Sequence, residues 1–316
     1  MIEKTIDVII PCFNEEDNIR AVYEETCRVE TEISGYSFKY IFINDGSSDG
    51  TLAAIRELAA GDERVKYISF SRNFGKEAAM YAGICNSKGD YAVIMDADLQ
   101  HPPALIKEML DTIETTGCDC CAARRVTRRG EQKIRSLGAR LFYKLMNRFS
   151  EIEIADGVLD YRLMNRNMVR AIRQMPENQR FSKGIFAWVG FDTRWVEFEN
   201  VKRVRGESKW SLFALIKYAM DGFINFAVSP LKFAGWFGGL AACGSALYLI
   251  AEIVKTLIMG RDTPGYASTI CLILFFGGLN IAILALIGEY IGRMYMETKG
   301  RPVYIEKESN IHEDED

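Results

Sequence analysis

The first 125 residues alternate short apolar segments with longer amphipathic ones, and this alternation restricts the fold more than any other feature. The apolar segments have the length of buried strands, and the amphipathic segments have the length of helices. Strands separated by such helices predict an α/β fold, with a mostly parallel sheet flanked by helices on both faces. The expected strands are 6–10, 38–43, 65–70, 91–95 and 118–122; helices are expected at 17–33, near 48, from 75 and after 103.

Polar clusters follow three of these expected strands. They are Pro11–Glu16, Asn44–Thr51 and Asp96–Gln100. Ligands of parallel sheets bind beyond the carboxyl ends of the strands, where such clusters converge. The three clusters therefore predict a binding site at one edge of the sheet.

The third cluster contains two carboxylates and a carboxamide at alternate positions, Asp96, Asp98 and Gln100. If the chain stays extended there, the three side chains point the same way. Neighbouring carboxylates repel each other unless a cation or protons lie between them. Oxygen ligands of this kind suit Mg²⁺ or Mn²⁺ that carries substrate phosphates. For an Asp-x-Asp pair taken alone, a solvated strand end is the alternative.

Two long stretches near the C-terminus contain no charged residue. They are Phe233–Ala251, with 19 residues, and Tyr266–Gly288, with 23. As helices they reach about 28 and 34 Å, close to the thickness of a bilayer core. We expect transmembrane helices at about 233–254 and 266–289, with a pair of buried core helices as the alternative. Lys and Arg are concentrated before the first stretch and after the second, which places both termini in the cytoplasm.

Composition adds little beyond this. The net charge is -4, and the eight cysteines are scattered, as expected for reduced thiols of a cytosolic domain. The cysteines around Cys118–Cys121 have no second cluster and no nearby histidine to complete a metal site. The N-terminus has no signal peptide pattern. The acidic tail, 306–316, is expected to be disordered.

A basic segment follows the last expected strand. Apolar side chains recur in it at helical spacing, so we expect a basic amphipathic helix at about 131–149. Such a helix fits an anionic membrane surface, and nucleic acid is the rival partner. The two apolar stretches favour the membrane, and no nucleic-acid partner is expected. The cations of the segment are Arg124, Arg125, Arg128, Arg129, Lys133, Arg135, Arg140, Lys144 and Arg148.

Taken together in order, several motifs resemble those of family 2 glycosyltransferases. The resemblance is to the polyprenyl-phosphate branch, which includes dolichyl-phosphate mannose synthase-like and bactoprenol glucosyltransferase-like enzymes, and it implies a glycosyltransferase A-type sheet. Asn44 departs from the pattern, because many members carry a second aspartate before the one matched by Asp45. The motifs are Val8–Glu16, Asn44–Thr51, Ser71–Lys76, Asp96–Pro103, Leu159–Leu163 and Arg205–Trp210.

The resemblance implies roles for individual residues. The donor nucleotide sugar would contact Pro11, Phe13, Glu15, Asp45, Lys76, Asp96 and Arg124. The metal would be held by Asp96, Asp98 and Gln100, and the acceptor phosphate by Arg203, Arg205 and Lys209. Catalytic roles fall to Asp98, Asp156, Asp160 and Arg162. A phosphate monoester is largely dianionic at neutral pH and is itself nucleophilic, so a strong base is less necessary. Asp156 and Asp160 stay open as bases, with Asp160 favoured as a residue that orients Arg162 or the acceptor.

The implied enzyme is an inverting, Mg²⁺- or Mn²⁺-dependent transferase in the cell membrane. It would move one sugar, with UDP-glucose as the first candidate donor, to undecaprenyl phosphate at the cytoplasmic face. Residues 1–210 would form the catalytic domain, 211–232 a juxtamembrane segment, 233–290 two transmembrane helices and 291–316 a cytoplasmic tail. Small residues at spacing four in the apolar stretches predict a homo-oligomer. A processive polysaccharide synthase and a non-catalytic membrane scaffold are the alternatives.

Overall fold

The computed structural model describes residues 4–125, 157–198 and 265–311, with isolated helical positions between 237 and 258. Several predictions lie outside these described residues. They concern the basic helix at 131–149, the juxtamembrane segment at 211–232, most of the first apolar stretch, and the side chains of Asp156, Arg203, Arg205 and Lys209.

The described strands form one sheet in the order β7-β5-β6-β4-β1-β2-β3-β8. β1 pairs in parallel with β2 and β4, and β2–β3 and β5–β7 are also parallel. β6 runs antiparallel to β4 and β5, and β8 runs antiparallel to β3. The predicted α/β class and mostly parallel sheet are therefore confirmed. The strands are β1 (Lys4–Cys12), β2 (Tyr36–Asn44), β3 (Val65–Phe70), β4 (Tyr91–Ile94), β5 (Cys120–Arg125), β6 (Val158–Asn165), β7 (Thr193–Phe198) and β8 (Glu306–Ser309).

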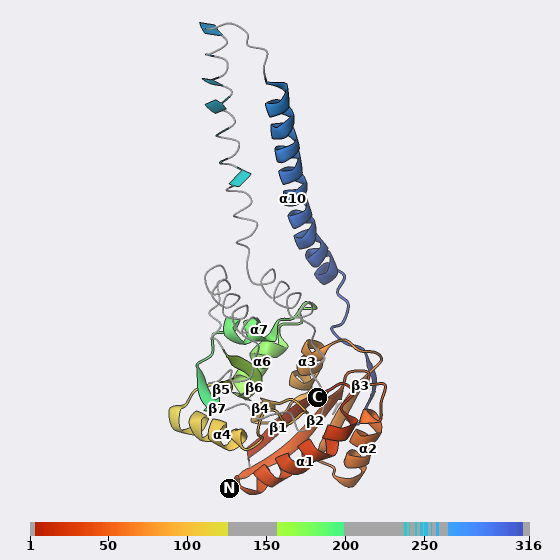
Figure 1. The fold of residues 1–316 in the computed structure, drawn as a ribbon. Coiled ribbons are helices and arrows are strands. Elements are labelled where there is room, and N and C mark those ends of the chain that lie inside the picture. Colours follow the sequence, from red (N-terminus) through yellow and green to blue (C-terminus); the bar gives the residue numbers. More distant parts are fainter. Residues whose placement is uncertain are drawn as a thin grey trace.

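Helices cover both faces of this sheet (Figure 1). The strands are apolar on both sides, so alternate residues of β1 enter different cores: Val8 packs on one face and Ile9 on the other. α1, α2 and α4 contribute to the first core, and α3, α6 and α7 to the cores of the opposite face. The helices are α1 (Glu16–Thr31), α2 (Thr51–Gly61), α3 (Lys76–Asn86), α4 (Leu105–Thr116), α6 (Arg166–Arg173) and α7 (Ser182–Trp188).

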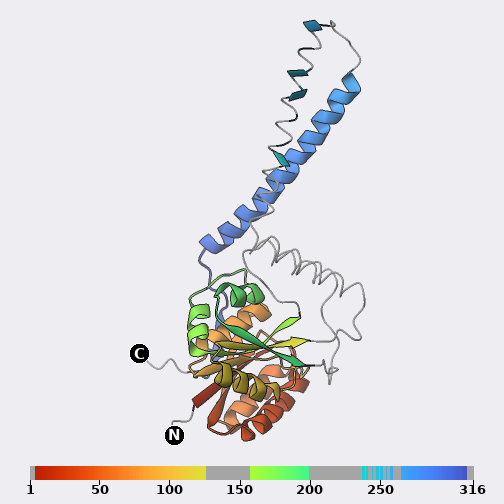
Figure 2. The ribbon, with the colours of Figure 1, turned by 90° about the vertical axis from the view of Figure 1, so that its left-hand side faces the viewer.

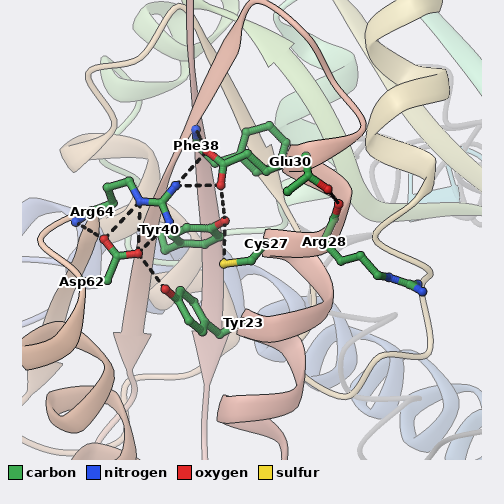
Figure 3. Close-up of polar contacts among 9 residues, drawn as sticks. Tyr23, Cys27, Arg28, Glu30, Phe38, Tyr40, Asp62 and Arg64 are labelled. Carbon is green, nitrogen blue, oxygen red and sulfur yellow. Dashed lines mark hydrogen bonds and ion pairs between the residues drawn. The ribbon is translucent and has the colours of Figure 1, made fainter.

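A polar cluster joins α1 to the strands on its side of the sheet (Figure 3). The Arg64 guanidinium donates to both Glu30 and Asp62, with N–O distances down to 2.7 Å. The Tyr23 hydroxyl donates to Asp62 at 2.6 Å, and the Tyr40 hydroxyl to Glu30 at 3.1 Å. Hydrogen bonds from Arg64 and Tyr23 outweigh burial and lower the pKa of Asp62 to about 2. This cluster fixes the end of α2 against α1.

One long helix, α10 (Tyr266–Thr298), projects away from the α/β domain in both views (Figures 1 and 2). Its segment Phe275–Thr298 is long and apolar enough to cross a membrane, and side chains such as Ile281 and Leu284 are exposed. The helix begins where the second apolar stretch predicts and continues past the expected end at 289. At its C-terminal end, next to the α/β domain, the Glu297 carboxylate accepts hydrogen bonds from the backbone N–H groups of Asn178 and Gln179.

Residues 96–100 differ from the expected extended conformation. β4 ends at Ile94, and the chain then turns, with Leu99 in the left-handed region at φ 54°. The Asp98 carboxylate accepts a hydrogen bond from the backbone N–H of Gln100 at 3.1 Å, which stabilises this turn. The prediction that strict alternation aligns the three side chains is therefore wrong, because the turn replaces the strand.

The expected disorder of the whole tail is also wrong. Glu306–Ser309 form strand β8, which pairs with the edge strand β3. An ion pair between Arg56 and Glu308 and hydrogen bonds between the Asn310 side chain and the backbone of β3 hold the segment there. The polar strand is stable because it completes the backbone hydrogen bonds of an otherwise open sheet edge.

Candidate active site

A pocket of about 400 Å³ opens at the carboxyl ends of β1, β2 and β4. Seven of the predicted site residues line it: Pro11, Phe13, Glu15, Asp45, Lys76, Asp96 and Asp98. Of the described residues, neither Gln100 nor Arg124 is among those that line the pocket. The strand-end clusters thus converge as predicted. Further lining residues are Cys12, Asn73, Gly75, Ala79 and Ala97.

Asp45 lines the pocket and is 3% exposed. Its carboxylate accepts hydrogen bonds from the backbone N–H groups of Phe74 and Gly75, at 2.6 and 2.9 Å. Burial raises the pKa of Asp45, and these two donors oppose that rise. Each carboxylate oxygen has a second acceptor position, so Asp45 can anchor the loop and still accept from a ligand.

The loop 71–75, which Asp45 anchors, depends on two glycines with positive φ, one in the loop and one beside Asp45. Gly75 has φ 98°, a conformation that other residues rarely adopt. Gly46 has φ 65°, and a Cβ atom there would lie 2.4 Å from the backbone carbon of Arg72. The close approach of these two loops brings Asp45 and the loop 71–75 to the same wall of the pocket.

Asn44, which departs from the family pattern, links the end of β2 to β3 and to the loop after Asp45. Its side-chain amide donates to the Ser69 hydroxyl of β3 at 2.9 Å. Its side-chain oxygen accepts from the backbone N–H of Ser47 at 3.2 Å. Both ends of the carboxamide are therefore used, and since the Ser69 hydroxyl can also donate, a carboxylate at this position could accept from the same two partners.

Lys76 joins two carboxylates from distant parts of the chain. Its ammonium lies 2.6 Å from Asp96 and 3.4 Å from Asp160. Burial would lower the pKa of Lys76, but these two carboxylates raise it. Burial likewise opposes ionisation of Asp160, yet Lys76, Lys183 and Arg162 hold its pKa at about 2. Asp160 is therefore a carboxylate at neutral pH, held beside the pocket by Lys76.

Arg162 lies deeper in the structure than its predicted role implies. It is 3% exposed, and its guanidinium lies 3.7 Å from the ring centroid of Phe186. It donates to the carbonyl oxygen of Leu159 at 3.0 Å, and burial lowers its pKa. The structure places Arg162 beneath the site, where its charge acts on Asp160 from within the domain.

Two residues near the pocket were not singled out from the sequence. His101 is buried between Tyr161 and Phe198, and its Nδ1 atom lies 3.9 Å from Asp96. Glu77 accepts hydrogen bonds from the backbone N–H and hydroxyl of Ser182, which ties α7 to α3 beside Lys76. His101 lies inside the motif Asp96–Pro103, so this motif could have identified His101 from the sequence.

The pocket's donor set fits a divalent cation that is bound together with a diphosphate. Within the described ranges, no three His, Cys, Asp or Glu side chains converge as a preformed metal site. Asp96 and Asp98 supply two carboxylates at one wall, and Mg²⁺ in nucleotide sites uses one or two carboxylates with substrate phosphates. The second oxygen of Asp160 is buried without a hydrogen-bond partner among the described residues. The oxygens present therefore suit Mg²⁺ or Mn²⁺.

Known glycosyltransferases are similar to this chain in sequence. Residues 7–173 match the model of the family Glycosyl transferase family 2. The chain is 46% identical to the putative glycosyltransferase CsbB of Bacillus subtilis over 97% of this chain and 92% of that protein. It is 39% identical to the bactoprenol glucosyl transferase of Shigella phage SfII, over 96% and 98% respectively. A crystal structure of glucosyl-3-phosphoglycerate synthase from Mycobacterium tuberculosis is similar at 18% identity with TM-score 0.45, covering 69% of this chain and 76% of that one. The family model covers more than half of the chain and the relatives cover nearly all of it, so this chain belongs to the family 2 glycosyltransferases.

Proposed function

We propose that the protein transfers a single sugar from a nucleotide diphosphate sugar to polyprenyl phosphate at the cytoplasmic face of a membrane. The observation that carries this proposal is the pocket that joins Asp45, Lys76, Asp96 and Asp98 at the strand ends. Relatives named bactoprenol glucosyl transferases, matched over nearly their whole length, support a glucosyl group as the sugar and bactoprenol as the lipid of the acceptor. Within this class, UDP-glucose is our candidate donor and undecaprenyl phosphate our candidate acceptor.

The donor's nucleoside fits the wall formed by β1 and β2. Asp45 offers free acceptor positions for hydrogen bonds from a base or ribose, and Glu15 lies at the same wall. Phe13 is 40% exposed at the pocket, and an exposed ring there gives a flat apolar face for a base. In this arrangement the diphosphate points toward Lys76 and the two carboxylates of the 96–98 turn.

The departure of the nucleoside diphosphate requires stabilisation of negative charge. Asp96 and Asp98 would hold Mg²⁺ or Mn²⁺, which would supply that stabilisation when bound. Lys76, which already lies against Asp96, adds a cation at the same place. Its ammonium is positioned to move from the carboxylate to a diphosphate oxygen, since both are anionic acceptors.

The acceptor brings its own nucleophile. The second pKa of a phosphate monoester is near 6, so the acceptor is largely dianionic at neutral pH. A carboxylate whose pKa lies at about 2, such as Asp160, is a weak base. We therefore assign Asp160 to holding Lys76 in place. The direct displacement inverts the configuration at the sugar carbon. Contacts of Arg203, Arg205 and Lys209 with the acceptor phosphate remain predictions.

The proposed location is the cell membrane, with two transmembrane helices and with the catalytic domain and both termini in the cytoplasm. Support comes from α10, whose exposed apolar surface suits a lipid environment, and whose end at Glu297 contacts the catalytic domain. Homo-oligomerisation through the small residues of the apolar stretches is part of the same proposal. Its measurement is the mass of the particle in mild detergent, where a strictly monomeric species counts against it.

A transfer assay with the full-length protein in detergent tests the function. The protein is incubated with labelled UDP-glucose, undecaprenyl phosphate and MnCl₂, and the label that enters the lipid phase is counted. We expect label in the lipid, its loss on chelation of the metal, and its loss in Asp98→Asn, with Asp111→Asn on the exposed surface of α4 as the matched control. Absence of labelled lipid from every common nucleotide sugar overturns the proposal.

A further inference from the structure

The segment after the long helix, residues 301–311, returns from α10 to the far edge of the sheet (Figure 1). It adds β8 to β3 and packs Val303, Tyr304 and Ile311 against the core cluster on the α3 face. The need to cover an open sheet edge explains why the polar segment 306–309 forms a strand. It does not explain the contacts made by Tyr304 and Ile305, which precede that strand.

Those contacts reach the loop 71–75, which lines the candidate donor pocket. The backbone carbonyl of Ile305 accepts a hydrogen bond from the backbone N–H of Ser71 at 3.0 Å. The Tyr304 ring stacks on Phe70, with centroids 4.8 Å apart and planes 19° apart. Phe70 in turn meets the edge of Phe74, with centroids 5.7 Å apart. The C-terminal segment thus touches Ser71, the first residue of the loop, and Phe70, which in turn contacts Phe74 within the loop.

The loop 71–75 connects the C-terminal segment to the pocket. The backbone N–H groups of Phe74 and Gly75 donate to Asp45, and Gly75 and Asn73 line the pocket wall. Helix α3 starts directly after the loop, at Lys76. A shift of the Phe70–Phe74 pair therefore moves the donors of Asp45, and with them the wall of the pocket and the start of α3.

We propose that Tyr304 is a positioning residue for donor binding, which acts by holding the loop 71–75 in its binding conformation. The identity of the donor rests on the proposed function, but the contact between the C-terminal segment and the pocket wall does not. A loop that is ordered before binding loses less conformational freedom when the ligand arrives, so its release weakens binding. The effect falls on the nucleotide sugar and leaves the acceptor unaffected.

The experiment compares full-length wild type, Tyr304→Ala, Tyr304→Phe and Glu308→Gln. The phenylalanine variant keeps the ring that stacks on Phe70. Glu308→Gln weakens the ion pair with Arg56 at the other end of the segment. Two quantities are measured: the dissociation constant of UDP in MnCl₂ by calorimetry, and the KM values for UDP-glucose and undecaprenyl phosphate with kcat.

We expect Tyr304→Ala to raise the UDP dissociation constant and the donor KM roughly tenfold, the scale of a lost aromatic pair with its packing. The acceptor KM and kcat should stay within about twofold of wild type, since donor binding weakens equally in the ground state and the transition state. Tyr304→Phe and Glu308→Gln should bind UDP like wild type. Unchanged UDP binding in Tyr304→Ala overturns the inference, as does an equal loss in both KM values and kcat.

If Tyr304→Ala does not fold, Tyr304→Leu keeps apolar volume while it removes the stacked ring, and the same measurements apply. Hydrogen exchange at residues 71–75 gives an independent reading, because a released loop exchanges faster while β1 and β2 keep their protection. Unchanged exchange in the loop contradicts the inference. UDP binding is measured without transfer, so a wild-type protein that binds UDP but makes no lipid product refutes the proposed function alone.

Discussion

Removal of the Lys76 ammonium should increase the affinity of the nucleotide-free protein for Mn²⁺. Lys76 lies 2.6 Å from Asp96 and 3.4 Å from Asp160, so it already neutralises Asp96, a carboxylate that a divalent ion would use. A metal that binds before the nucleotide must compete with this ion pair. In Lys76→Met the competitor is absent, while the length of the side chain is nearly kept.

The size of the effect follows from the electrostatics of the pair. Lys76 is one of three cations that lower the pKa of Asp160 against the opposing effect of burial. In the other pair, the Lys76 and Asp96 side chains are 38% and 30% exposed, so solvent screening limits the competition to about 1 kcal/mol. We therefore expect Mn²⁺ to bind roughly fivefold more tightly in the variant.

The assay is the electron paramagnetic resonance signal of free Mn²⁺, titrated with full-length protein in detergent without nucleotide. Lys107→Met, at an exposed lysine on α4, is the matched control and should bind like wild type. With the donor added, Lys76→Met should transfer sugar about 100-fold more slowly or worse, because a cation at the diphosphate is lost. Equal or weaker Mn²⁺ binding by nucleotide-free Lys76→Met refutes the competition between lysine and metal.

Two further predictions concern the stability of the α/β domain. Arg64→Ala should lower the free energy of unfolding by about 1 to 2 kcal/mol at pH 7, since Arg64 is itself partly exposed. The pKa of Asp62 is about 2 in the folded state, against 3.8 for the free side chain, so this contribution is complete above about pH 4 and is lost as the pH falls toward 2. In urea unfolding, the difference in stability between wild type and Arg64→Ala should therefore be smaller at pH 2.5 than at pH 7, and equal differences would contradict the prediction. Gly83→Ala should lower stability by about 1 to 3 kcal/mol, because the new Cβ atom would lie 2.1 Å from the Ile9 side chain. Ile9→Ala itself lowers stability, but the loss in the double variant should be smaller than the sum of the two single losses in thermal unfolding, and additive losses would argue against the clash.

Much of the fold was predictable because its strands are short apolar segments with polar ends. Val8 and Ile9 enter cores on opposite faces, which is why these segments read as buried strands without polar alternation. The same strand ends gave most of the pocket, including Asp45 and Asp96, since parallel strands bring their carboxyl ends together.

Other features depend on contacts that the sequence does not reveal. The turn after β4 places Leu99 at positive φ, although leucine gives no signal for such a conformation. Strand β8 is polar, and it forms because β3 offers an open edge and Phe70 a surface for Tyr304. The pairing of Lys76 with Asp160 joins α3 to β6, and only the antiparallel placement of β6 beside β4 brings them together.

The mass spectrum of the lipid product tests the central claim most directly. Full-length protein is incubated with MnCl₂, UDP-glucose and undecaprenyl phosphate, and the lipids are extracted into organic solvent. Their masses and fragments are then measured by mass spectrometry. The account predicts one hexose joined to the lipid phosphate, formed by wild type and absent with Asp98→Asn. A ladder of hexoses, or unchanged lipid with every nucleotide sugar supplied, would contradict it.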